Sequence, residues 1–179
     1  MWIQALLTPN QLVNSLAGLF PLQILLDGTD PDRFLRVERP TRVTTTHAGI
    51  RLDTSACMQW DVIGIKVPLV MRHLVLTLIP SIAQREGEDA LVLSLRLDDA
   101  DLSVVPEFVE TPLLQRVNEE LAKEGAQIVW RFTHTLDFHF TLPDRIVGAP
   151  RLHLFAHQGA TRISDEGIVL AAHFRVEAH

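Results

Sequence analysis

Apolar and polar residues alternate with a period of two over most of this chain. Such alternation is typical of β-strands that place one face on a core and the other toward solvent. The segments that show it are 36–46, 49–62, 73–83, 90–106, 126–143, 149–158 and 167–178. No strand–helix–strand rhythm and no glycine-rich phosphate loop accompanies them, so the sequence predicts an α+β fold with about eight antiparallel strands.

Two stretches have the spacing of amphipathic helices instead. Each opens with a Thr-Pro pair, in which Thr8 or Thr111 can cap the helix and the proline fits its first turn. Residues 18–21 end the first helix, and Gly125 follows the second. The apolar stripes are Leu12, Val13, Leu16 and Phe20 in the first helix and Leu114, Val117 and Leu121 in the second.

The strand 90–106 carries a change of phase. The apolar residues of its expected inner face are Leu91, Leu93, Leu95 and Leu97, continued out of phase by Ala100, Leu102 and Val104. A β-bulge at Asp98–Asp99 restores a common face. Because bulges bend long strands, we expect a highly curved sheet that wraps around the two helices.

Two further patterns complete the predicted sheet. The charged turn 84–89 joins the strands 73–83 and 90–106 into an antiparallel hairpin. The segment 126–143 alternates without a break and predicts one long, half-buried strand. Its apolar row consists of Ile128, Trp130, Phe132, His134, Leu136, Phe138, Phe140 and Leu142.

The segments 41–58 and 161–176 resemble each other. Both read Thr-Arg and a β-branched residue, then a turn that ends in Gly49 or Gly167, then Ile-x-Leu or Ile-Val-Leu in an alternating strand. Internal duplication and chance similarity between strand–turn–strand segments are both open explanations.

Composition limits the classes of function. The length of 179 residues suits one domain, residues 1–179. With 47% hydrophobic residues and a mean hydropathy of +0.16, the chain has more apolar side chains than the core of a small domain needs. Some apolar side chains can therefore face a cavity or a partner. A net charge of −6 argues against nucleic acid. With no secretory signal legible, we expect a cytoplasmic location, or a periplasmic one if the sequence is a trimmed mature form.

Candidate chemistry is sparse. His139, His153 and His157 invite a metal hypothesis, but His153 and His157 lie about 13 Å apart along an ideal strand, so we expect no metal site. The acidic residues around Asp98 are explained by the bulge. Without a nucleophile–base pair, neither an enzyme nor a bound cofactor is expected.

The pattern of the chain resembles a known family. An apolar strand closing at Pro80, a charged turn, a strand running into Asp-Ala-Asp-Leu and a helix with "VNEEL" follow one another between residues 74 and 121. Together with the opening "LTPNQLVNSLAGLFPLQ", this order resembles the tubular lipid-binding superfamily, which includes bactericidal/permeability-increasing protein and the synaptotagmin-like mitochondrial lipid-binding domains. Within it, the sequence is most similar to the YceB-like bacterial lipoproteins.

This resemblance implies a curved antiparallel sheet around a helix, with a groove that binds a lipid or another long apolar molecule without catalysis, and transient contact with membranes. It implies that the groove is lined by Leu91, Leu93, Leu95, Leu114, Val117, Leu121, Trp130, Phe132, Leu136, Phe138 and Phe140, with Trp60 on the same concave face. The alternative is that these residues fill a closed core. The protein is then an interaction module that forms a homodimer or joins a complex through sheet edges or an apolar patch.

Overall fold

The structure of the chain is a computed structural model, and it describes residues 1–26, 34–62, 65–101, 107–141, 143, 151–164 and 166–178, without the side chains of 60–67 and 107–109. The strands are β1 (Trp2–Leu7), β2 (Leu22–Leu25), β3 (Phe34–Val37), β4 (Arg42–Thr46), β5 (Gly49–Val62), β6 (Ile65–Arg85), β7 (Glu88–Ala100), β8 (Ile128–Trp130), β9 (Asp137–Thr141), β10 (Arg151–Ser164) and β11 (Gly167–Ala178). The helices are α1 (Pro9–Ala17), α2 (Glu107–Leu121) and α3 (Phe132–Thr135), with a 3-10 turn, η1, at Glu124–Ala126.

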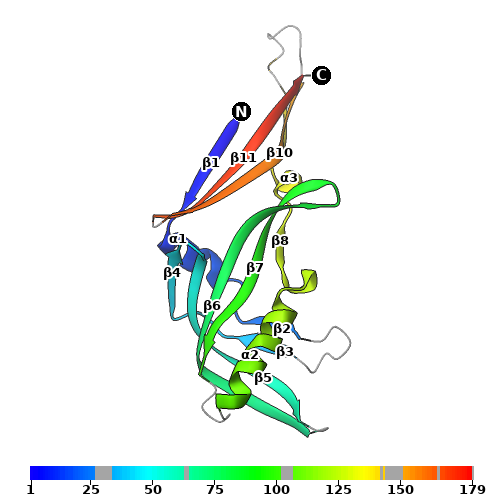
Figure 1. Ribbon diagram of the computed structural model, residues 1–179. Helices are drawn as coiled ribbons and strands as arrows, with labels where there is room; N and C mark the ends of the chain where they lie inside the picture. Colours follow the sequence, from blue (N-terminus) through cyan, green and yellow to red (C-terminus); the bar gives the residue numbers. More distant parts are fainter. Residues whose placement is uncertain are drawn as a thin grey trace.

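The described strands form two antiparallel sheets, so the fold is α+β as expected, but with two sheets in place of one. The seven-stranded sheet has the order β2-β3-β5-β6-β7-β8, with β4 paired to β5, and the four-stranded sheet has the order β1-β11-β10-β9. Figure 1 shows the four-stranded sheet at one end of the molecule and α3 at the junction of the two sheets.

The predicted hairpin of β6 and β7 is confirmed. Its register ends at the pair Arg85–Glu88, which leaves Glu86 and Gly87 as a two-residue turn. Both turn residues have positive φ, 55° and 88°, as a two-residue type I′ hairpin turn requires.

The predicted bulge in β7 is also confirmed. Val75 pairs with Asp99 and Leu76 pairs with Leu97, so Asp98 is the extra residue. As a result Leu97 and Ala100 are both buried, at 4% and 1% exposed. The continuation at Leu102 and Val104 lies outside the described residues.

The bulge also satisfies a buried hydroxyl. Thr77, 2% exposed, donates a hydrogen bond from Oγ1 to Asp98 Oδ2 at 2.5 Å, and Arg96 Nε donates to Asp98 Oδ1 at 2.7 Å. Burial acts to raise the pKa of Asp98, but these two hydrogen bonds and the charge of Arg96 outweigh it and hold the pKa below the usual 3.8.

The first helix begins as the sequence predicts. Pro9 occupies its first turn, and the Thr8 backbone N–H donates to Gln11 Oε1 at 3.0 Å, half of a capping box. Leu12 and Leu16 are buried in the core of the seven-stranded sheet, whereas Val13 from the predicted stripe is 38% exposed.

The second helix begins earlier than expected. It starts at Glu107, so the prediction of Thr111 as its cap is wrong, and Pro112 lies inside the helix. Asn118 docks α2 on β7: Leu97 N–H donates to Asn118 Oδ1, and Asn118 Nδ2 donates to Leu97 O, both at 2.8 Å. The side-chain amide therefore pairs with the bulged strand as a neighbouring strand would.

The prediction of one strand over 126–143 is wrong. β8 ends at Trp130, a single helical turn follows, and β9 begins at Asp137 in the other sheet. Phe132 and Leu136 are four residues apart and lie on one face both in a strand and in a helix, so this apolar pair fits either structure. The chain uses this turn to pass from one sheet to the other.

The two similar hairpins share their turn. Gly49 and Gly167 have φ values of 150° and 144°. A Cβ on either glycine would lie 2.3 Å from Leu78 O or 2.1 Å from Leu7 O, so both positions exclude a side chain. The Thr46 and Ser164 hydroxyls donate to Gly49 O and Gly167 O. The hairpins belong to different sheets, and both have the same turn chemistry.

Candidate functional site

An apolar pocket of about 330 Å³ lies where the two sheets meet. Its lining is almost entirely hydrocarbon and comes from both sheets and α3: Ile3, Ala5, Ile82, Leu91, Trp130, Phe132, Leu136, Phe138, Ala160, Leu170, Ala171, Ala172 and Phe174. Ile3 and Phe138 at its rim are 47% and 41% exposed, so the pocket is accessible from solvent. Its volume falls at the lower end of the usual range for small-molecule sites, about 300–1,000 Å³.

Phe132 of α3 forms the floor of this pocket. Phe132 is 4% exposed, and its ring packs against β10 at Gly159, where a Cβ would stand 2.4 Å from the ring. Trp130 packs edge-on against Phe132, with ring centroids 6.3 Å apart, and its Nε1–H donates to Thr135 Oγ1. Because Gly159 has no side chain, the Phe132 ring can pack directly against β10 at this position.

The β6–β7 hairpin holds α3 in place through polar contacts. Arg131 donates two hydrogen bonds to the carboxylate of Glu86, at 2.6 and 2.7 Å. Thr133 Oγ1 donates to Glu88 Oε2 at 2.5 Å, and His134 Nε2 lies 2.9 Å from the same oxygen. The Thr133 hydrogen bond, aided by His134 and Arg131, lowers the pKa of Glu88. These exposed contacts fix the orientation of α3 and add little stability.

The apolar inner face of the four-stranded sheet extends beyond the pocket. Phe140 follows Phe138 on the same face of β9, and Val176 lies across β10 on β11. Phe140 is 49% and Val176 58% exposed. The pocket is therefore the inner end of a longer, partly uncovered apolar surface.

The structure divides the residues predicted to line a groove. Leu91, Trp130, Phe132, Leu136 and Phe138 line the pocket, and Leu93 packs beside it. Leu95, Leu114, Val117 and Leu121 belong to the other cluster, in which α1 and α2 cover the seven-stranded sheet. Phe140 lies on the exposed continuation of the pocket wall, and the Trp60 side chain lies outside the described part.

Much of the pocket wall was missed by sequence reasoning. Ile3, Ala160, Ala172 and Phe174 come from β1, β10 and β11, whose pairing could not be read from local pattern. The signal present in the sequence was the small residues of β10 and β11, which leave space that large side chains would fill.

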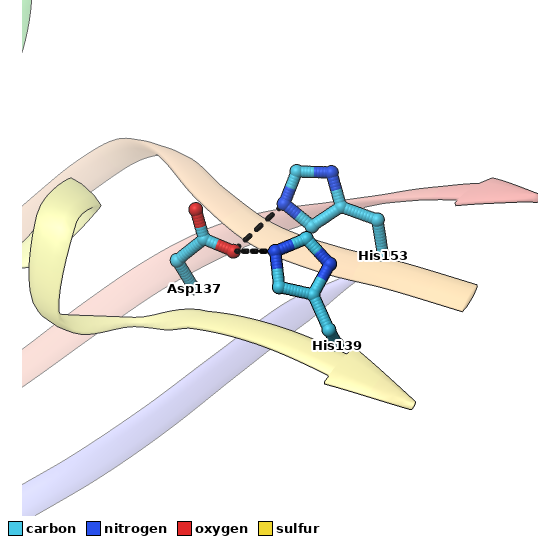
Figure 2. Close-up of side chains that lie close together, drawn as sticks. All are labelled: Asp137, His139 and His153. Atoms are coloured by element: carbon cyan, nitrogen blue, oxygen red, sulfur yellow. Dashed lines mark hydrogen bonds and ion pairs between the residues drawn. The ribbon is translucent and has the colours of Figure 1, made fainter. Parts of the chain in front are cut away.

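The opposite face of the same sheet carries histidines. His139 and His153 pair across β9 and β10, and Asp137 lies on the same face two residues before His139 (Figure 2). His157 lies at a bulge in β10, and its Nε2 is 2.9 Å from His173 Nδ1. We expected no metal site because His153 and His157 lie far apart along one strand, whereas the structure brings histidines together across neighbouring strands.

No helix in the described part of the chain has the length and apolarity needed to cross a membrane. The chain matches no protein-family model, no curated protein and no solved structure.

Proposed function

We propose that this protein binds a lipid or another long apolar molecule, without catalysis, in the pocket between its two sheets. The observation that carries the proposal is the combination of an accessible hydrocarbon-lined pocket with an apolar sheet face that continues outward from it. The resemblance to the tubular lipid-binding superfamily, with the YceB-like lipoproteins nearest, supports the same kind of ligand.

The pocket suits an extended ligand better than a compact one. A chain seated over Phe132 can continue past Phe138 along the exposed face toward Phe140. Each buried methylene contributes about 0.8 kcal/mol, so ten methylenes contribute roughly 8 kcal/mol before the costs of association. That energy corresponds to affinities no tighter than about micromolar, which suits a carrier that must release its ligand to a membrane or a partner.

The competing function is a protein–protein interaction module. The exposed side chains of Phe138, Phe140 and Val176 also fit a surface that a second copy of the chain covers. In that case the pocket is closed by protein and holds no ligand. The two functions make different predictions for mass and for probe binding.

The test combines native mass spectrometry with a fluorescent fatty-acid titration. We expect a monomer that carries co-purified lipid mass and binds the probe saturably. Ala172→Trp should abolish probe binding by filling the pocket, because Ala172 packs beside it. Arg175→Trp, which adds the same side chain at an exposed position of β11, should leave binding unchanged. A dimer that binds no probe would instead establish the interaction module.

A further inference from the structure

Asp137, His139 and His153 converge on the outer face of the four-stranded sheet. The β9–β10 register pairs His139 directly with His153, and the imidazole rings stack at 4.3 Å with an angle of 16° between them. Asp137 Oδ1 lies 2.7 Å from His153 Nε2 and 3.6 Å from His139 Nε2. In Figure 2 both rings present a nitrogen to the same carboxylate oxygen.

These three atoms have the spacing of ligands around one metal ion. Zinc binds histidine nitrogen at about 2.0–2.1 Å and carboxylate oxygen at about 2.0–2.2 Å, so neighbouring ligand atoms in a tetrahedral site are about 3.3 Å apart. The two measured distances from Asp137 Oδ1 fall on either side of that value, and all three atoms lie within 4.8 Å of one another. Closing the site requires side-chain rotations that bring the three atoms to similar distances from one ion.

We propose that Asp137, His139 and His153 bind a divalent first-row transition metal ion of the zinc class. Ions of this class bind a donor set of two imidazoles and one carboxylate better than magnesium or calcium do, because magnesium and calcium prefer oxygen ligands. Three protein ligands leave at least one coordination position for water or another ligand. With 76% of the His139 side chain and 42% of the Asp137 side chain exposed, that position faces solvent.

The surroundings fit a cation. Phe155 packs against the His153 ring at 4.7 Å and supports its orientation. Glu177 of β11 stands opposite His153 in the register, which puts a second carboxylate on the same face of the sheet. A carboxylate near the ligands also adds negative charge that favours a bound cation.

The ion also connects this face to the apolar pocket. Phe138 lies between Asp137 and His139 in β9, so its side chain points to the opposite face of the strand and lines the pocket. A metal ion bound by residues of both β9 and β10 crosslinks the edge strand β9 to its neighbour β10. The pocket wall formed by Phe138 then becomes more rigid.

Zinc titration of the tag-free, chelator-treated protein tests the proposal by isothermal calorimetry. We expect one Zn²⁺ per chain for the wild type and a loss of at least about tenfold in affinity for both His139→Ala and His153→Ala, since even changes to outer partners cost about 10–100-fold. His47→Ala removes an exposed histidine from the β4–β5 turn and should bind zinc as the wild type does.

A second control separates this cluster from the other histidine pair. The double variant His157→Ala/His173→Ala should keep the wild-type zinc affinity, and all metal-free variants should melt within a few degrees of the wild type. Absence of stoichiometric zinc binding by the wild type overturns the proposal. So does binding that survives both His139→Ala and His153→Ala, or binding that the His157/His173 double variant loses.

Discussion

The two sheets of this molecule differ in how far their apolar faces are covered. In the seven-stranded sheet, Leu52 and Leu76 are fully buried, because α1 and α2 cover the inner face. In the four-stranded sheet, Phe138, Phe140 and Val176 on the corresponding face are 41%, 49% and 58% exposed. Burial stabilises the first region, whereas the second retains apolar surface that a ligand or partner can still cover.

The difference follows from what each sheet has to pack against. Two helices supply leucines to the seven-stranded sheet. The four-stranded sheet packs instead against the helical turn that carries Phe132 and against Ile82, Leu91 and Leu93 of the β6–β7 hairpin. The first region is therefore expected to set the stability of the fold, and the second to set its binding properties.

The largest effect should come from truncating the closed core. Leu76→Ala removes a fully buried side chain and should lower the free energy of unfolding by about 2–5 kcal/mol. Phe140→Ala, at a half-exposed position of the open face, should cost less than about 1 kcal/mol. Urea unfolding measures both values, and equal losses would contradict the division of roles between the sheets.

The contact that docks α2 should come next. Asn118→Ala leaves the N–H and C=O of Leu97 without their side-chain partners, which should cost about 1–3 kcal/mol. Gln115→Ala, on the exposed side of the same helix, is the matched control and should change stability by less than about 0.5 kcal/mol. A neutral Asn118→Ala would show that water replaces the amide at no cost.

Substitution at the pocket floor should affect binding more than stability. Gly159→Ala places a methyl group against the Phe132 ring and should cost about 1–2 kcal/mol through overpacking. Displacing the ring should also weaken binding of the fluorescent fatty acid. The probe affinity is measured by titration alongside the wild type. An unchanged affinity would mean that the ligand does not bind against Phe132.

The smallest effect concerns the bulge and depends on pH. Because the pKa of Asp98 is lowered in the fold, its stabilising effect is present above about pH 3.8 and is lost as the pH falls through the lowered pKa. The difference in unfolding free energy between wild type and Asp98→Asn should therefore shrink below pH 3.8. Chemical denaturation between pH 2.5 and 7 measures it, and a difference independent of pH contradicts this role of the carboxylate.

Local features of the fold were predictable from the sequence, and long-range ones were not. The capping of α1 by Thr8 and Gln11 and the bulge at Asp98 depend on residues close together in the chain. The pairing of Trp2 with His173, which builds the second sheet, leaves no local signal. The helical turn at Phe132 was misread because apolar residues four apart fit both a strand and a helix.

The same limit applies to the candidate sites. The aromatic residues of the pocket were recognisable in the sequence, but the small residues of β10 and β11 that create its space became meaningful only with the sheet order. Likewise, the pairing of His139 with His153 depends on a cross-strand register that spacing along one strand does not reveal.

Quenching of Trp130 by a brominated fatty acid tests the central claim most directly. Trp130 lines the pocket, whereas Trp2 lies on β1 against His173. If an acyl chain occupies the pocket, dibromostearate should quench the fluorescence of the wild type saturably, and Trp130→Phe should abolish most of that quenching. Wild-type fluorescence that does not respond to the lipid, or quenching that is the same in Trp130→Phe, would contradict an apolar ligand site between the two sheets.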